Sequence, residues 1–349
     1  MHLKLSPPAR LGTQAAIAIL LATAIAHWVG AYRSYWAVMT AMLLISQTWG
    51  ESIKKAWTRG AMTLLGGLVG TGLFFIIQGH PYLLFAAIVC CVFLMVYFIE
   101  TSYLLTVFFV TIFVVFLFAS ISEWNMRLLE ARIYDTFIGA GVAIVTTALV
   151  FPITAKTNFR NQLPQFIQKL QAATDQCLNL FNPQPSNEKA MLMEYKHLPA
   201  QFNQLQDNLK HINYEYLFKS FPKQKFKQTM LQTTILYHYV TSAIAAYVPI
   251  KNAQNIAKLQ PEFLDIQQTI DNNYALILAT LNNEPSSKTL ISLEDARQRL
   301  HKKIVGSLNS DPVTQATWFD FASYFYFILK INETLIELAT IFGKPLKPP

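Results

Sequence analysis

Long apolar runs separated by short polar stretches fill the first 152 residues of the chain. Six runs can be counted, and most approach the roughly twenty residues with which a helix crosses a bilayer. They cover residues 15–32, 34–46, 60–77, 82–99, 103–119 and 133–151. A soluble core could supply one such run but hardly a series. The pattern therefore predicts a polytopic membrane protein with about six transmembrane helices.

The second and third runs form a predicted hairpin. Residues 34–46 are too few for an upright span, so this helix must be short, tilted or completed by its polar flanks. The third run carries Gly66 and Gly70 at helical spacing, and Gly139 lies in the sixth. Glycines of this kind let another helix approach closely. Between the two runs we expect a short polar turn that holds Lys54, Lys55 and Arg59.

After residue 152 the pattern becomes polar and helical. Apolar side chains recur every three or four positions, as in Phe159, Leu163, Phe166, Ile167 and Leu170. Proline at position 312 follows an Asp, which is typical of a helix start. The sequence predicts an all-α chain with two domains, a transmembrane domain at 1–152 and a bundle of five or six helices at 153–349. The run 224–247 is the predicted central helix of that bundle.

Charge is distributed unevenly between these two parts. Only eight of the 28 Lys and Arg residues and five of the 20 Asp and Glu residues lie in the first 152 positions. Loops on the cytoplasmic side of a membrane are enriched in Lys and Arg. With the N-terminus inside, that side would hold Lys4, Arg10, Lys54, Lys55, Arg59, Lys156 and Arg160, and the other side Arg33, Arg127 and Arg132. We therefore expect both termini, and the whole second domain, in the cytoplasm.

Catalytic signatures are missing from the sequence. It contains no G-x-S-x-G, no H-E-x-x-H, no Walker lysine and no glycine-rich loop opening a helix. The three cysteines show no C-x-x-C spacing, and Lys and Arg do not cluster with aromatic residues. We predict no enzyme activity, no cofactor, no metal and no nucleic acid partner. The predicted surroundings of the first domain are a lipid bilayer.

Charges inside the apolar runs are the main candidates for function. Arg132 and Asp135 lie three residues apart, so a helix places them on one face, where they can neutralise each other. One interpretation is an anion-binding or proton-linked site, because a charge in a span usually faces the protein interior or a water path. The other is a self-paired anchor at the outer interface, where snorkelling relieves the cost of burial.

Other polar residues in the runs have a structural and a functional interpretation. Arg33, next to Tyr35, would bind a carboxylate between aromatic walls or anchor the interface. His27 would relay protons or sit at the interface as a satisfied histidine. Trp36 would pack against lipid or protein unless it faces a cavity. Topology alone explains Lys54, Lys55 and Arg59.

Several of these residues resemble the fusaric acid resistance family, which includes inner-membrane exporters of aromatic acids. The matching features are Tyr35–Trp36–Ala37, the basic residues 54 and 55, and Arg59 before Thr63 and Gly66, although Met62 stands where glycine is usual. Arg132, Asp135, Gly139 and the Phe151–Pro152 pair match the sixth helix of the family. The resemblance covers roughly residues 12 to 152.

The resemblance implies export of aromatic carboxylic acids or related toxic compounds across the bacterial inner membrane. Some relatives work with a periplasmic adaptor protein. Many carry two copies of the helices-plus-domain unit, so one copy here implies a homodimer or higher homo-oligomer. Gly66, Gly70 and Gly139 would pack between subunits or within one. The alternatives to a secondary transporter are an anion channel and a non-transporting scaffold whose helical domain binds a partner.

Overall fold

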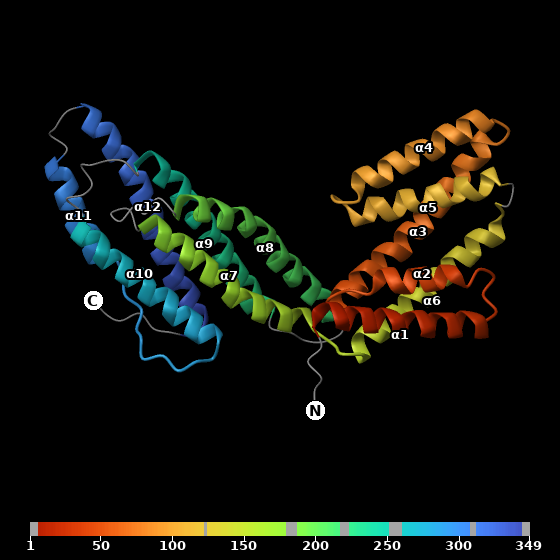
Figure 1. Cartoon of the computed structure of the whole chain (residues 1–349), viewed down its shortest axis with the longest axis horizontal. Helices are drawn as coiled ribbons and strands as arrows, with labels where there is room; N and C mark the ends of the chain where they lie inside the picture. The colour runs from red at the N-terminus through yellow and green to blue at the C-terminus, as the bar shows by residue number, and fades with distance from the viewer. Residues whose placement is uncertain are drawn as a thin grey trace. The chain divides into compact units, whose positions relative to one another are not determined.

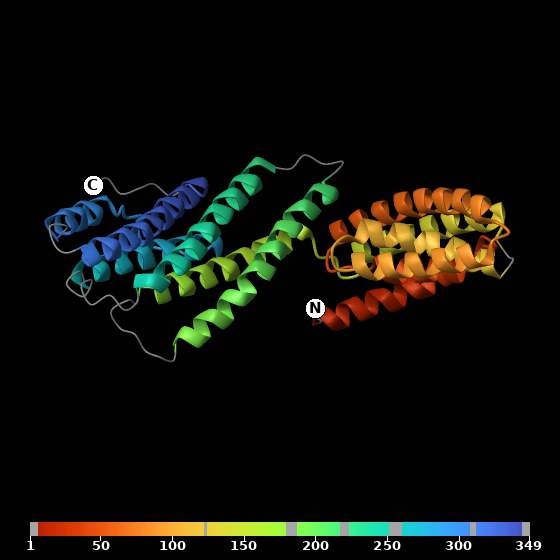
Figure 2. The same ribbon diagram turned by 90° about the horizontal axis from the view of Figure 1, so that it is seen from above.

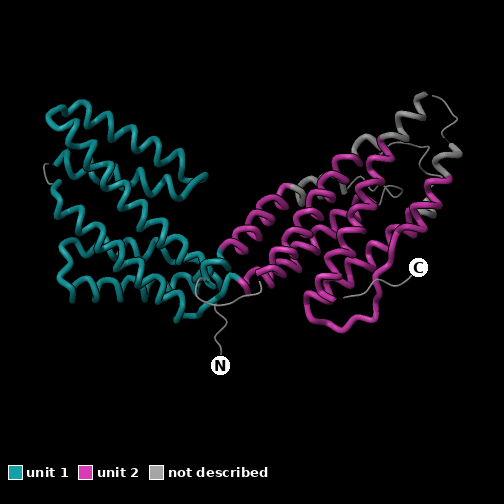
Figure 3. The backbone as a smooth tube through the Cα atoms, turned by 180° about the vertical axis from the view of Figure 1, so that it is seen from behind, with its two compact units in different colours: residues 1–155, 211–217 teal, residues 156–210, 218–349 magenta. Residues whose placement is uncertain are grey.

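The structure is a computed structural model that describes residues 6–121, 124–178, 187–216, 223–250, 260–307 and 312–343. Twelve α-helices account for the regular secondary structure of these residues, as the all-α prediction requires. The chain divides into two compact units, coloured separately in Figure 3. Unit 1 comprises residues 1–155 and 211–217, and unit 2 comprises residues 156–210 and 218–349.

Unit 1 contains the six helices that the apolar runs predicted. They are α1 (Pro7–Trp28), α2 (Tyr35–Leu44), α3 (Trp49–Ile77), α4 (Pro81–Phe98), α5 (Tyr103–Ser120) and α6 (Met126–Leu149). In Figure 1, α1 lies along α2 and α6, and α4 lies along α5. Helix α3 packs against both α5 and α6, so it joins the two groups. This position makes α3 the centre of the unit.

The helices of unit 1 have the surface of a membrane protein. Among the described residues, α1, α3, α4 and α5 are long and apolar enough to cross a bilayer. On α4 only 6% of the apolar window is buried, which leaves Phe85, Phe93 and Tyr97 exposed. A surface this apolar requires lipid rather than water. Helix α2 is shorter and α6 carries four charged residues, so the count of six spans stays a prediction.

The predicted polar turn between the second and third runs is wrong. Helix α3 begins at Trp49, and Lys54, Lys55 and Arg59 lie inside it. Thr48 caps the helix, because its hydroxyl accepts a hydrogen bond of 3.3 Å from the backbone N–H of Glu51. One helical turn later, the ammonium group of Lys55 pairs with Glu51 at 2.9 Å. The polar stretch is therefore the first part of a long helix rather than a turn.

Three glycines bring the helices of unit 1 close together. A Cβ atom on Gly66 would lie 2.8 Å from the carbonyl oxygen of Phe108 on α5, and one on Gly139 would lie 2.4 Å from the carbonyl oxygen of Ala37 on α2. Gly70 approaches Val115 on α5 in the same way. These contacts lie within one chain, so the three glycines no longer argue for contact between subunits. The homo-oligomer stays a prediction on other grounds.

Replacing Gly139 by alanine should destabilise unit 1. The added methyl group would force α2 and α6 apart, and overpacking of this kind typically costs about 1–3 kcal/mol. Gly141 is the matched control, since nothing lies within 4 Å of a Cβ atom there. Thermal unfolding of the full chain in detergent should show a lower midpoint for Gly139→Ala only. Equal midpoints for the two variants would contradict the close packing of α2 and α6.

Unit 2 is a bundle of six helices, and its cytosolic location stays a prediction. They are α7 (Ala155–Leu178), α8 (Asn187–Glu215), α9 (Lys223–Ile250), α10 (Gln260–Leu281), α11 (Glu294–Ser307) and α12 (Pro312–Ile341). Figure 2 shows α9 beside α12, with which it makes the most extensive contact of the bundle. On α9, the predicted central helix, Met230, Leu236 and Val240 are buried and Ile235 is half-buried. Helix α12 begins at the predicted proline.

The last residues of α8 belong to unit 1, which the sequence did not predict. The carboxylate of Glu215 accepts hydrogen bonds from the backbone N–H groups of Gly50, at 3.3 Å, and Ala155, at 2.5 Å. These N–H groups lie at the starts of α3 and α7, where a helix dipole favours negative charge. Gly50 leaves the space that this side chain occupies, because a Cβ atom there would lie 2.6 Å from Glu215 Cγ.

Candidate functional site

A cavity of about 470 Å³ lies among the helices of unit 1. Helices α2, α3, α4, α5 and α6 all contribute to its wall, which is largely apolar and aromatic. Trp36, Tyr103 and Phe113 supply the rings, and Arg59 and Arg132 supply the charge. A volume of a few hundred cubic ångströms with a few polar groups is typical of small-molecule sites.

Both arginines are buried and line the same cavity. Helices α3 and α6 run antiparallel, with Gly60 beside Phe137 and Gly67 beside Leu129, so Thr63 of α3 lies near the level of Arg132. Arg59 lies one turn from Thr63 on the same face of α3. The exposed fractions of Arg59 and Arg132 are only 7% and 6%. Two positive charges therefore face one enclosed space.

The guanidinium groups keep hydrogen-bonding capacity unused. Within the described part of the chain, the buried Nε atoms of Arg59 and Arg132 make no hydrogen bond, and neither residue forms an ion pair. Burying an uncompensated charge in a membrane is costly. The two guanidinium groups are favourable here only if an anion or water accepts hydrogen bonds from their unused N–H groups. This requirement is expected of an anion-binding site.

Trp36 forms one wall of the cavity and is held in place by its neighbours. The guanidinium carbon of Arg132 lies 5.0 Å from the centre of the indole ring, within range of a cation–π contact. The ring of Phe118 packs edge-on against the indole, with 5.7 Å between the ring centres. Because Trp36 is only 4% exposed and lines the cavity, it is placed to contact a ligand and not lipid.

Asp135 is the most deeply buried charge of the set, with 2% of its surface exposed. It does not line the cavity, and it forms no ion pair with Arg132 although both residues are described. Its Oδ2 atom is buried without a hydrogen bond in the described structure. Asp135 and Gly139 are four residues apart, so they share the face of α6 that packs against α2.

The family model described as fusaric acid resistance protein-like matches residues 21–146. The matched range contains the whole wall of the cavity, including Trp36, Arg59 and Arg132. Unit 1 belongs to the fusaric acid resistance protein-like family. No curated protein matches the chain. The family and the apolar helices together support a transporter-like role in a membrane.

Other candidate residues of this fusaric acid resistance protein-like unit lie outside the cavity wall. The guanidinium group of Arg33 donates a hydrogen bond of 3.1 Å to the hydroxyl of Tyr35 and lies 4.7 Å from the ring centre of Phe118. Tyr35 is 46% exposed and His27 is also exposed. The structure therefore unites Trp36, Arg132 and Arg59 in one cavity wall, and Arg33, Tyr35 and His27 are not part of that wall.

Arg59 and Thr63 are the site residues that the sequence-based argument missed. In the sequence, Arg59 was interpreted only as a sign of membrane topology, because a basic residue near the end of an apolar run is expected on the cytoplasmic side. A signal was nevertheless present. Arg59, Thr63, Gly66 and Gly70 follow each other at spacings of three or four, which places them on one face of the family's third helix. A face of small and polar residues with one arginine is typical of a helix that faces protein rather than lipid.

Unit 2 contains two neighbouring half-buried carboxyl groups, Asp175 on α7 and Asp271 on α10. Burial, together with the hydrogen bond to Asp271 and the negative charge of that residue, raises the pKa of Asp175 to about 8. The neighbouring hydroxyl groups of Thr174 and Tyr274 lie 3.1 Å apart. At neutral pH the folded protein therefore holds a proton on Asp175, where α7 faces α10.

The stability of unit 2 should fall as the pH rises from about 4 to about 8. In this range the folded protein holds a proton on Asp175 that the unfolded chain, with an ordinary pKa of 3.8, has already lost. Replacing Asp175 by asparagine should flatten this dependence and raise the unfolding midpoint at pH 9. Asp207→Asn is the control, because Asp207 forms only an exposed pair with Lys210. Thermal unfolding at pH 5, 7 and 9 checks the prediction. An unchanged slope in Asp175→Asn would contradict it.

Proposed function

We propose that the chain is a secondary transporter that exports small aromatic carboxylic acids, with the cavity of unit 1 as its binding site. One observation carries this proposal. The guanidinium groups of Arg59 and Arg132 are buried beside Trp36, and neither forms an ion pair with a described residue. A scaffold that used its helices only as an anchor would have no need for two buried arginines around a cavity.

The charges of the site match one carboxylate. Arg59, Arg132 and Asp135 together carry a net charge of +1, which a single carboxylate cancels. A guanidinium group binds a carboxylate through two parallel hydrogen bonds, and the free Nε atoms provide such donors. The rings of Trp36 and Phe113 would hold the aromatic part of the acid. Asp135 would orient Arg132 or carry the coupled proton.

The proposed setting is the bacterial inner membrane, with six spans and both termini in the cytoplasm. Unit 2 would then lie in the cytosol, and the functional protein would be a homodimer or a higher homo-oligomer that pairs with a periplasmic adaptor. Reporter fusions after residues 30, 50, 81 and 349 test the topology. A periplasmic C-terminus would contradict it. Mass measurement in mild detergent tests the assembly, and a clean monomer would contradict it.

A sensitivity screen tests the function itself. A strain that lacks the gene is grown with a panel of aromatic acids and dyes, alongside the same strain carrying the gene on a plasmid. We expect the deletion strain to be sensitive to one or more aromatic acids and the plasmid to restore growth. Equal growth across the panel, in a parent strain shown to express the gene, would favour the scaffold. Conductance of a purified, reconstituted protein would identify an anion channel.

Replacing Arg59 by glutamine should reduce export per molecule about tenfold or more. The amide keeps most of the side-chain volume but removes a positive charge that faces the carboxylate. Lys54→Gln is the matched control, because Lys54 lies on the same helix and does not line the cavity. Efflux of radiolabelled benzoate, divided by the amount of protein in the membrane, measures the effect. Equal losses in the two variants would show that Arg59 acts only through topology.

A further inference from the structure

A second cavity, of about 410 Å³, lies inside unit 2, where α7, α9, α10 and α12 meet. Its wall combines two kinds of side chain that rarely converge by chance. Three are cationic and three are aromatic: Lys156, Arg160, Lys225, Phe159, Phe226 and Phe342. The described residues that line the cavity include no Asp or Glu.

The aromatic side chains form a ready-made pocket for a flat ring. Phe159 is 2% exposed and its ring centre lies 5.6 Å from that of Phe226. The ring of Phe342, from the end of α12, lies on another side, with the ammonium group of Lys225 at 5.3 Å from its centre. A ligand ring in this space could make edge and face contacts of the kind that stabilise aromatic clusters.

Two of the three cations in this wall have no carboxylate partner in the described part of the chain. Arg160 and Lys225 form no ion pair with any described residue. Lys156 and Lys225 also lie in the first turns of α7 and α9, where the positive ends of two helix dipoles already disfavour cations. Arg160 and Lys225 thus bring two cations to one cavity whose described wall has no carboxylate, and this charge distribution indicates an anionic ligand.

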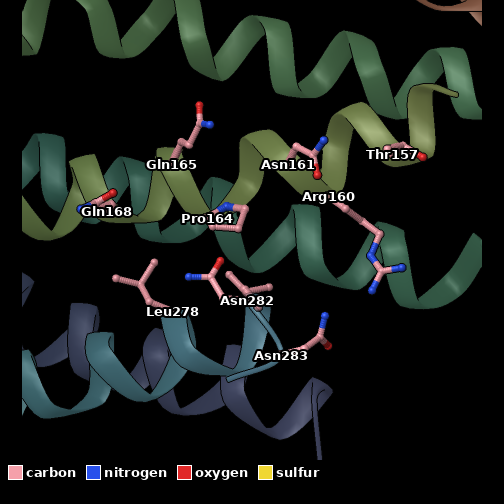
Figure 4. Close-up of a pocket in the computed structure, with 10 residues that line it drawn as sticks. Thr157, Arg160, Asn161, Pro164, Gln165, Gln168, Leu278, Asn282 and Asn283 are labelled. Carbon is pink, nitrogen blue, oxygen red and sulfur yellow. The ribbon is translucent and has the colours of Figure 1, made fainter. Parts of the chain in front are cut away.

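A polar cleft adjoins the cavity, and Arg160 lines both spaces. This cleft, of about 810 Å³, lies between α7 and the end of α10 and is lined mainly by amide side chains. Figure 4 shows Arg160 and Asn283 at one end of it, and both residues also line the cationic cavity. The guanidinium group of Arg160 can therefore bind an anion whose ring lies among the phenylalanines, while further polar substituents extend into the cleft.

We propose that unit 2 carries its own binding site for small aromatic carboxylates, formed by Arg160, Lys225 and the ring of Phe226. The combination of cationic side chains with aromatic walls indicates this class of ligand. The proposed site does not depend on transport through unit 1. Binding to the folded bundle alone would stabilise unit 2 in proportion to the ligand concentration. The occupancy of unit 2 would thus report the concentration of the acid in its own compartment.

Titration of 4-fluorobenzoate, followed by fluorine NMR, tests this site in the full chain. The protein carries Arg132→Gln and is held in phosphatidylcholine nanodiscs, so the cavity of unit 1 does not contribute. We expect saturable binding that weakens at least tenfold when Arg160→Gln and Lys225→Gln are added. Both side chains are exposed, so folding should be unaffected. The matched control adds Lys223→Gln and Lys227→Gln, exposed positions on the same helix, and should stay within twofold.

Three further measurements separate this ligand class from others. The neutral 4-fluorobenzamide should bind at least tenfold more weakly than the acid, and equal binding would overturn the role of charge. Inorganic phosphate should compete poorly, and stronger binding of phosphate than of the acid would overturn the aromatic class. Affinity should be the same in phosphatidylglycerol nanodiscs, and its loss there would assign the site to a lipid headgroup instead. Unchanged affinity in the Arg160 and Lys225 variant would overturn the proposal outright.

Discussion

Replacing Arg132 by glutamine should abolish export while leaving the amount of protein in the membrane unchanged. Arg132 is 6% exposed, lines the cavity and contacts Trp36, so it is placed to bind the carboxylate directly. Removing one partner of a buried charge pair typically costs 2–5 kcal/mol, which corresponds to a loss of at least about thirtyfold in affinity. Efflux of radiolabelled benzoate, normalised to membrane protein, measures the loss.

Arg127→Gln is the matched control for this experiment. Arg127 lies on the same helix, five residues earlier, but it is exposed and does not line the cavity. It should transport at the wild-type rate. If Arg132 were only an anchor, Arg132→Gln would lower abundance or have no effect, and export per molecule would match that of Arg127→Gln. That outcome would contradict the proposed binding site in unit 1, and the family assignment would be unchanged.

Hydrophobic periodicity predicted where the helices of unit 1 lie because lipid contact imposes it. The run at 82–99 and the run at 103–119 each agree with a helix, α4 and α5, to within one residue at either end. The prediction failed at the start of α3. There polar residues were interpreted as a turn, whereas Thr48 and the Glu51–Lys55 pair stabilise a helix. An apolar pattern cannot show a helix end that extends into a polar environment.

The site itself was only half predictable. Arg132 and Trp36 were candidates because charge and large rings in an apolar run are rare enough to stand out. Arg59 was not, since its position near one end of an apolar run satisfies topology equally well. Arg59 becomes a cavity residue only because α3 packs antiparallel against α6. That packing depends on contacts between the two helices, such as that of Gly67 with Leu129. Sequence spacing along one helix contains no such information.

Contacts between distant segments were also beyond the sequence. Glu215 bonds to Gly50 across 165 residues, and no local pattern relates the two. The cationic cavity of unit 2 likewise combines the starts of α7 and α9 with the ends of α10 and α12. Lys156 and Arg160 had been assigned to membrane topology alone. In each case the residue type was visible in the sequence, and only the fold revealed its neighbours.

Burial bears on the two interpretations of Arg132 and Asp135, an anion site and an interfacial anchor. A snorkelling anchor keeps its charged group at the interface with water. Here both side chains are more than nine-tenths buried, and they form no ion pair with each other. The arginine faces the cavity and the aspartate does not line it. This asymmetry favours a binding site, because the arginine is placed to contact a ligand in the cavity and the aspartate is not.

Exchanging the two charges exploits that asymmetry. The double variant Arg132→Asp with Asp135→Arg keeps the net charge and the spacing of the pair, so an anchor should tolerate it. A binding site should not. The carboxylate would now face the cavity and repel the acid, and the guanidinium group would move about 4–5 Å along the helix, out of the cavity wall.

We therefore expect the exchanged protein to show no export above the deletion strain, even where it is present in the membrane in normal amounts. Asp135→Asn alone gives the second reference, since it should abolish export or shift its pH dependence if the carboxyl group carries a proton. Abundance is measured for each variant, so poor insertion is separated from lost function. Normal export per molecule in the exchanged protein would end the site hypothesis, because no carboxylate-binding arginine would then remain at position 132.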